Sequence, residues 1–180
     1  MSEIKQIRVF SVDDHPLLHE GLATVIRHQA DMLMVAEAAN GREAIQRFRE
    51  HTPDVTLMDL RLPDMTGIDA MIAIRSEFPE ARIIILTTFA GETEIRRAIE
   101  AGACAYLLKT TPPKELVQTI RHVHAGNRQI PPEISAHLEE RKGDAESGLP
   151  KPSPTAEVTE DLSPSQRTFS ERISDLFRRK

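Results

Sequence analysis

The chain has 180 residues, of which 39% are hydrophobic and 28% are charged, a composition that indicates one folded domain with an extension. Its formal net charge of -5 provides no overall positive field to attract nucleic acid or anionic lipid. The single cysteine, Cys104, excludes an internal disulfide and fits a reducing compartment, so we expect a cytoplasmic protein. We expect no membrane association, because no apolar run approaches the ~20 residues of a spanning helix.

The first two thirds of the chain alternate between two hydrophobic patterns. Short apolar runs rich in β-branched residues predict strands at 7–12, 33–36, 55–58, 83–86 and 105–108. Segments with helical spacing lie between and after them, at 17–28, 42–50, 67–78, 92–101 and 113–124. Most of the runs are apolar on both faces, as buried parallel strands require. The alternation therefore predicts an α/β fold with a doubly wound, five-stranded parallel sheet.

The composition changes after Leu138. Residues 139–162 are rich in proline, glycine and charge and almost lack large apolar side chains, which predicts a flexible linker. Ser163, Pro164 and Gln166 then match a helix N-cap, a first-turn proline and a capping-box partner. Apolar residues follow on one helical face, so we expect a short amphipathic helix over 163–180.

Polar side chains stand directly after four of the five predicted strands. They are Asp13 and Asp14 after the first, Asp59 after the third, Thr87 and Thr88 after the fourth, and Lys109 after the fifth. In an open parallel sheet the carboxyl ends of the strands meet at one edge, where ligands bind. We therefore expect three carboxylates, hydroxyl groups and an ammonium group to converge there.

This set of groups has a specific chemistry. Clustered carboxylates repel one another unless a cation lies among them, and hard oxygen ligands suit Mg²⁺. A metal ion and Lys109 together could neutralise a phosphoryl group, with an aspartate as nucleophile. Taken singly, each residue has an ordinary interpretation, with Asp13 and Asp14 as helix caps and Lys109 as a solvated charge. Their joint position at the strand ends is what indicates a site.

Four stretches carry a more specific signal: VDDHP at 12–16, MDLRLPDMTG at 58–67, LTTF at 86–89 and GACAYLLK at 102–109. Together they resemble the receiver domains of two-component response regulators, particularly the NarL/FixJ-type transcription regulators. The resemblance covers residues 5–138, and we assign 1–138 to a receiver domain of the flavodoxin-like (βα)5 type. One departure is that Lys109 is followed by Thr110, where many receivers have proline, but NarL/FixJ-type receivers commonly lack that proline.

The resemblance implies a role for each acidic residue. Asp59 would accept the phosphoryl group from a phosphohistidine of a sensor histidine kinase. Asp14 and Asp59 would bind Mg²⁺ together with the backbone carbonyl of Arg61, whereas Asp13 would act mainly through a metal-bound water. The protein would thus be a signalling phosphoacceptor rather than an enzyme with turnover.

The resemblance also implies how phosphorylation would be transmitted. Lys109 would pair with one phosphoryl oxygen, and Thr87 would donate its hydroxyl to another. Tyr106 would then change its rotamer or exposure. The surface formed by 92–101 and 113–124 would change its affinity for a partner, and phosphorylation would promote homodimerisation or partner binding.

NarL/FixJ-type regulators continue into a helix-turn-helix DNA-binding domain that begins with a motif similar to Leu162-Ser163-Pro164. From Ser163 this chain has 18 residues, too few to bury a helix-turn-helix core. We therefore expect no direct DNA binding by this chain. Two explanations remain open, a receiver that acts alone through protein contacts and a truncated relative of a transcription regulator.

Two other functions use the same residues differently. A Mg²⁺-dependent phosphohydrolase of the haloacid dehalogenase type would carry a second aspartate two residues after the nucleophile, where this chain has Arg61. An inert flavodoxin-like binding module would respond to neither phosphodonor nor Mg²⁺.

His15 and His19 have a spacing that can hold zinc, but we interpret them as surface or packing residues. We interpret Cys104 as a small buried hydrophobe.

Overall fold

The computed structural model describes residues 6–88 and 91–130. Within them, strands and helices alternate throughout: β1 (Ile7–Val12), α1 (Pro16–Arg27), β2 (Met32–Ala38), α2 (Gly41–His51), β3 (Val55–Met58), α3 (Gly67–Glu77), β4 (Ile83–Thr87), α4 (Glu92–Glu100), β5 (Ala105–Leu108) and α5 (Pro113–His124). The predicted bounds of β1, β3 and β5 are correct. The prediction for β2 is too short because it omits the charged Glu37, whose side chain is half-buried in the strand.

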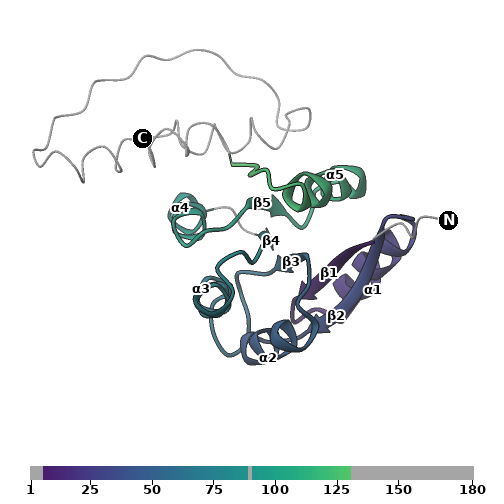
Figure 1. The fold of residues 1–180 in the computed structure, drawn as a ribbon. Helices are drawn as coiled ribbons and strands as arrows, with labels where there is room; N and C mark the ends of the chain where they lie inside the picture. Colours follow the sequence, from purple (N-terminus) through teal and green to yellow (C-terminus); the bar gives the residue numbers. More distant parts are fainter. Residues whose placement is uncertain (1–5, 89–90, 131–180) are drawn as a thin grey trace, which may run out of the picture. The chain divides into compact units, whose positions relative to one another are not determined.

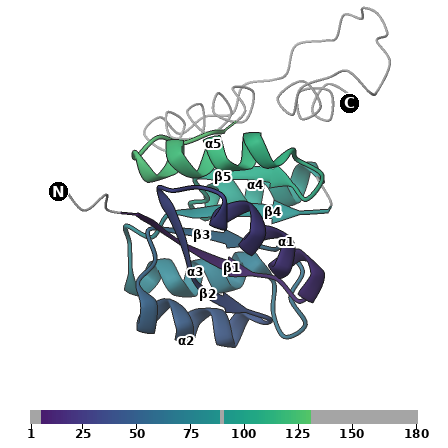
Figure 2. The ribbon, with the colours of Figure 1, turned by 90° about the vertical axis from the view of Figure 1, so that its right-hand side faces the viewer.

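The five strands form one parallel sheet in the order β2-β1-β3-β4-β5. Helices α1 and α5 cover one face of the sheet, and α2, α3 and α4 cover the other (Figure 1). The view in Figure 2 looks onto the face that carries α1 and α5. The predicted flavodoxin-like, doubly wound architecture is therefore confirmed.

The core lies on both faces of the three central strands. Every residue of β3 and β4 is buried, and so are five of the six residues of β1. A strand that is apolar on both faces cannot lie at a solvated surface, which is why these runs occupy the centre of the sheet. The rigid centre fixes the positions of the residues that follow these strands.

Side chains at the helix starts set the bounds of α2 and α3. Asn40 caps α2 by accepting a hydrogen bond from the backbone N–H of Glu43, and Thr66 caps α3 in the same way from Asp69. Helix α4 ends before Gly102, whose φ of 101° lies in the left-handed region and turns the chain into β5. Local sequence signals thus mark the starts of α2 and α3 and the end of α4.

Some expectations fall on residues that are not described. The predicted linker at 139–162, the predicted helix at 163–180 and the end of the assigned receiver domain, 131–138, lie outside the described residues. Among the described helices, none is long and apolar enough to cross a membrane.

Candidate functional site

The ends of β1 and β3 bring two aspartates together. The two strands are paired in register, with Val12 opposite Met58, so Asp13 and Asp59 both follow at the same edge. The Asp59 backbone N–H donates to the carbonyl of Val12 at 2.9 Å, which ties the two strand ends to each other. Asp13 and Asp59 are only 2% and 3% exposed, so two carboxylates are held in a poorly solvated place. Such a pair requires a cation nearby.

Lys109 supplies that cation in this structure. Its ammonium nitrogen lies 2.5 Å from Asp13 Oδ2 and 2.9 Å from Asp59 Oδ2, and its side chain is 10% exposed. Its backbone N–H donates to the carbonyl of Thr87, which fixes β5 against the end of β4. Burial alone would lower the pKa of Lys109, but the hydrogen bonds and charges of Asp13 and Asp59 outweigh burial and raise it. The lysine is therefore charged and bridges both carboxylates.

A histidine also lies at this edge. The His15 Nδ1 atom is 2.9 Å from Asp13 Oδ1 and 2.8 Å from Asp14 Oδ1. His19 reaches the same turn, with Nε2 2.6 Å from the backbone oxygen of Asp13. Sequence reasoning missed the contact of His15, because it considered the His15–His19 spacing and not the two aspartates directly before His15. The side chain of His15 is 68% exposed, as expected of a surface residue.

The donor atoms at this edge could hold a divalent cation. One ligand atom each from Asp13, Asp14, His15 and Asp59 lies within 4.8 Å of all the others. Carboxylate oxygens with one solvent-exposed side fit a hard ion such as Mg²⁺, which keeps several waters. The Asp14 side chain, 41% exposed, provides that open side.

The loop between β3 and α3 approaches Asp59 very closely. The backbone N–H of Gly67 donates to the carbonyl of Leu60 at 2.8 Å. A Cβ atom at position 67 would lie 1.9 Å from the backbone oxygen of Asp59, so only glycine fits. Arg61 forms an isolated antiparallel bridge with Thr66 in this loop. The bridge thus pairs Arg61, two residues after Asp59, with the residue that caps α3.

Thr87 and Tyr106 lie on the neighbouring strands. Both are 1% exposed, with Thr87 at the end of β4 and Tyr106 in β5, opposite Ile85. Burial first, then the negative charges of Glu94 on α4 and of Asp59, raise the pKa of Tyr106 well above its usual value. Burial and these two charges therefore favour the neutral form of Tyr106. Thr88 is exposed.

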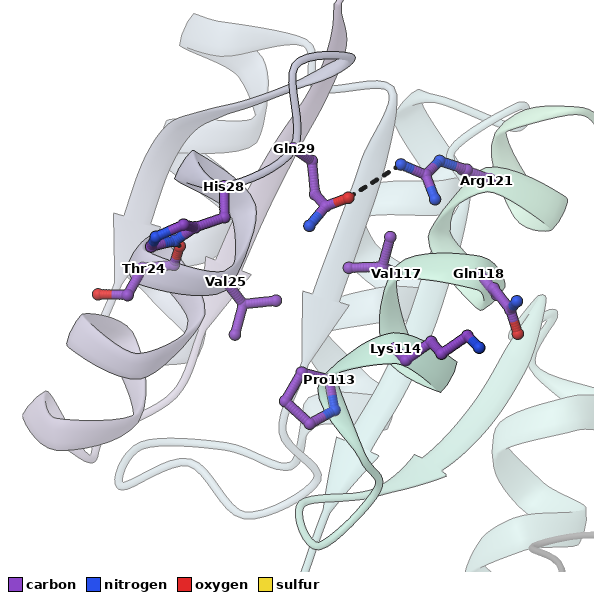
Figure 3. A pocket seen from close by; sticks show the side chains of 9 residues that line it. All are labelled: Thr24, Val25, His28, Gln29, Pro113, Lys114, Val117, Gln118 and Arg121. Atoms are coloured by element: carbon purple, nitrogen blue, oxygen red, sulfur yellow. Dashed lines mark hydrogen bonds between the residues drawn. The ribbon is translucent and has the colours of Figure 1, made fainter.

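A groove of about 510 Å³ lies between α1 and α5 (Figure 3). Val25 and Val117 contribute apolar surface, and Arg121 donates to the Gln29 side chain at 3.0 Å across the groove. Sequence reasoning did not predict this groove, because its two walls are about ninety residues apart in the chain. It contains none of the predicted site residues.

The prediction that Cys104 is buried is wrong. Its side chain is half-buried, and the residue lies directly before β5. It lines a concavity together with Arg82 and Arg128 at the start of the strand, remote from the end where Asp59 lies.

Comparison with known proteins identifies the family. The model of the response regulator receiver domain matches residues 9–121. The chain therefore belongs to the response regulator receiver domain family, a class of signalling domains in two-component systems. The matched residues include every strand and all five helices at least in part.

Several relatives support this assignment. The chain is 36% identical over 135 residues to the response regulator protein VraR of Staphylococcus aureus. The aligned residues make up 75% of this chain and 65% of VraR. A LuxR-family two-component response regulator from Aurantimonas sp. SI85-9A1 superposes with a TM-score of 0.68 and 40% identity, covering 77% of this chain and 99% of that structure. A DNA-binding LuxR-family response regulator from Staphylococcus aureus superposes with a TM-score of 0.62 and 29% identity, covering 66% and 98%.

Proposed function

We propose that Asp59 of this receiver domain accepts a phosphoryl group from a phosphohistidine of a sensor histidine kinase, in a reaction that depends on Mg²⁺. The observation that carries the proposal is the Lys109 ammonium group bridging two buried carboxylates, Asp13 and Asp59. A buried nucleophile with a fixed cation at 2.9 Å is prepared to receive a group that brings further negative charge.

Each residue of the site would have a separate role in the phosphoryl transfer. A carboxylate oxygen of Asp59 would form a bond to phosphorus as the phosphorus–nitrogen bond of the phosphohistidine breaks, and the imidazole nitrogen would keep the electron pair and take a proton from solvent. Lys109 would then pair with a phosphoryl oxygen. Asp13, Asp14, Asp59 and the carbonyl of Arg61 would hold Mg²⁺, which would supply charge neutralisation at the phosphoryl oxygens.

The switch would use the buried groups next to Asp59. The Thr87 hydroxyl would donate to a phosphoryl oxygen, which would draw the end of β4 inward. Tyr106 would respond, since its environment already includes the charges of Asp59 and Glu94. The surface of α4, β5 and α5 would then change its affinity for a second copy or for another protein partner.

Intact-mass spectrometry after incubation with acetyl phosphate and Mg²⁺ tests the proposal. We expect the wild type to gain the mass of one phosphoryl group, and Asp59→Asn to gain none. Asp54→Asn is a matched control, because Asp54 precedes β3 and binds the backbone N–H of Arg8 away from the site. Chelation of Mg²⁺ should abolish the gain in the wild type and in Asp54→Asn. Modification of Asp59→Asn would refute the assignment.

A further inference from the structure

The loop that carries the proposed metal ligands is attached to a helix on its far side. Asp64, in the middle of the loop between β3 and α3, accepts hydrogen bonds from the backbone N–H groups of Gly41 and Arg42 at 2.7 and 2.9 Å. These two N–H groups belong to the first turn of α2, where no carbonyl within the helix can accept them. The contact therefore joins the loop to the start of α2, although Asp64 is 23 residues from Gly41 and 22 from Arg42 in the chain.

Helix α2 thus has two caps of different origin. Asn40 caps it locally, accepting from the backbone N–H of Glu43 at 2.9 Å. Asp64 caps it from the loop and uses both of its carboxylate oxygens, one for each N–H. A negative charge at a helix N-terminus is also favoured by the helix dipole. Desolvation raises the pKa of Asp64, but the hydrogen bonds from Gly41 and Arg42 outweigh it and lower the pKa below its usual value.

The same loop is fixed at its other side by α3. Thr66 caps α3, and Gly67 holds the loop against the backbone of Asp59. The packing next to Asp64 is close, since a Cβ atom at Gly41 would lie 2.3 Å from Cγ of Met65. The loop is therefore held between the N-termini of two helices, and Arg61 lies between Asp59 and the Asp64 attachment.

We propose that Asp64 is a positioning residue for the metal site, holding the loop so that the Arg61 carbonyl and the Asp59 carboxylate face the same ion. This inference rests on the proposed function, because the ion is the Mg²⁺ proposed there. Asp64 does not touch the ion. It acts through the loop, as partners of metal ligands act in other sites, where their loss costs about 10- to 100-fold in metal affinity.

If Asp64 only stabilised the fold, its effect would be that of any cap of α2. Asn40, which caps the same end of α2, is therefore the matched control for this role. Asp64→Ala and Asn40→Ala each remove capping contacts from the same end of the same helix, so both should lower the melting temperature. Only Asp64→Ala should weaken Mg²⁺ binding, by about tenfold, as measured by titration calorimetry. Asn40→Ala should bind Mg²⁺ within about twofold of the wild type, a change too small for a lost metal partner.

Asp64→Asn provides a milder variant in case the alanine variant does not fold. An amide has one oxygen to accept two N–H groups, so we expect Mg²⁺ affinity between those of the wild type and Asp64→Ala. Unchanged Mg²⁺ affinity in both Asp64 variants, or an equal loss in Asn40→Ala, overturns the inference while leaving the proposed function in place. A wild type that neither binds Mg²⁺ nor gains a phosphoryl group overturns both.

Discussion

Substitution of Gly67 by alanine is the sharpest test of the geometry around Asp59. The backbone of Gly67 is not in the left-handed region, so alanine causes no conformational conflict there. The conflict is a contact, because the added Cβ would lie 1.9 Å from the Asp59 oxygen and 2.9 Å from its carbonyl carbon. Ordinary Cβ contacts begin at 3.4 Å, so Asp59 or the start of α3 must move by about 1.5 Å.

The cost follows from that displacement. Overpacking a well-packed interior costs about 1–3 kcal/mol, and a domain of this size loses about 4 °C in melting temperature per kcal/mol. We therefore expect Gly67→Ala to melt about 4–12 °C lower than the wild type, a range that follows from these two magnitudes. The clash is with the backbone of Asp59 and Gly67 begins the helix beside it, so either movement changes the surroundings of Asp59. Phosphorylation by acetyl phosphate should therefore also slow, which a loss of stability alone would not cause at low temperature.

Gly21 supplies the control. It lies on the exposed side of α1, and a Cβ atom there would meet nothing within 4 Å. Gly21→Ala should therefore stabilise the protein by about 0.5–1 kcal/mol through the higher helix propensity of alanine. The reasoning is refuted if differential scanning calorimetry finds Gly67→Ala as stable as the wild type and its phosphorylation rate is unchanged.

Two further predictions concern the buried ionisable groups. Lys109→Met removes the cation between Asp13 and Asp59. With Mg²⁺ removed by a chelator, we expect the free energy of unfolding, measured by urea denaturation, to fall by about 3 kcal/mol, and added Mg²⁺ should restore part of it. Equal urea midpoints for the variant and the wild type would contradict the bridge. The pKa of Tyr106 is raised in the folded state by burial, Glu94 and Asp59, so its contribution to stability is present below the unfolded pKa of about 10 and is lost as pH rises toward the folded pKa. Because Tyr106 is the one tyrosine and the chain has no tryptophan, tyrosinate absorbance should appear in the unfolded protein at a pH where the native protein shows none, and coincident titrations would argue against this environment.

The sequence by itself determined the strands and the edge of the sheet where the polar groups gather. Runs such as 7–12 and 55–58 are short, rich in β-branched residues and mostly apolar, a pattern typical of central parallel strands. The polar residue after each run must then lie at the carboxyl edge, which places Asp13, Asp59 and Lys109 together without knowledge of the strand order.

Tertiary structure alone decided the contacts between these groups. The distance from Lys109 to both carboxylates depends on how β5 packs beside β4 and β4 beside β3, which hydrophobic periodicity does not encode. The bond of Asp64 to α2 and the approach of Gly67 to Asp59 are likewise made between separate elements, and nothing local marks them in the sequence. Periodicity reports which face of an element is buried, whereas distances between side chains of different elements arise only when the elements are packed together.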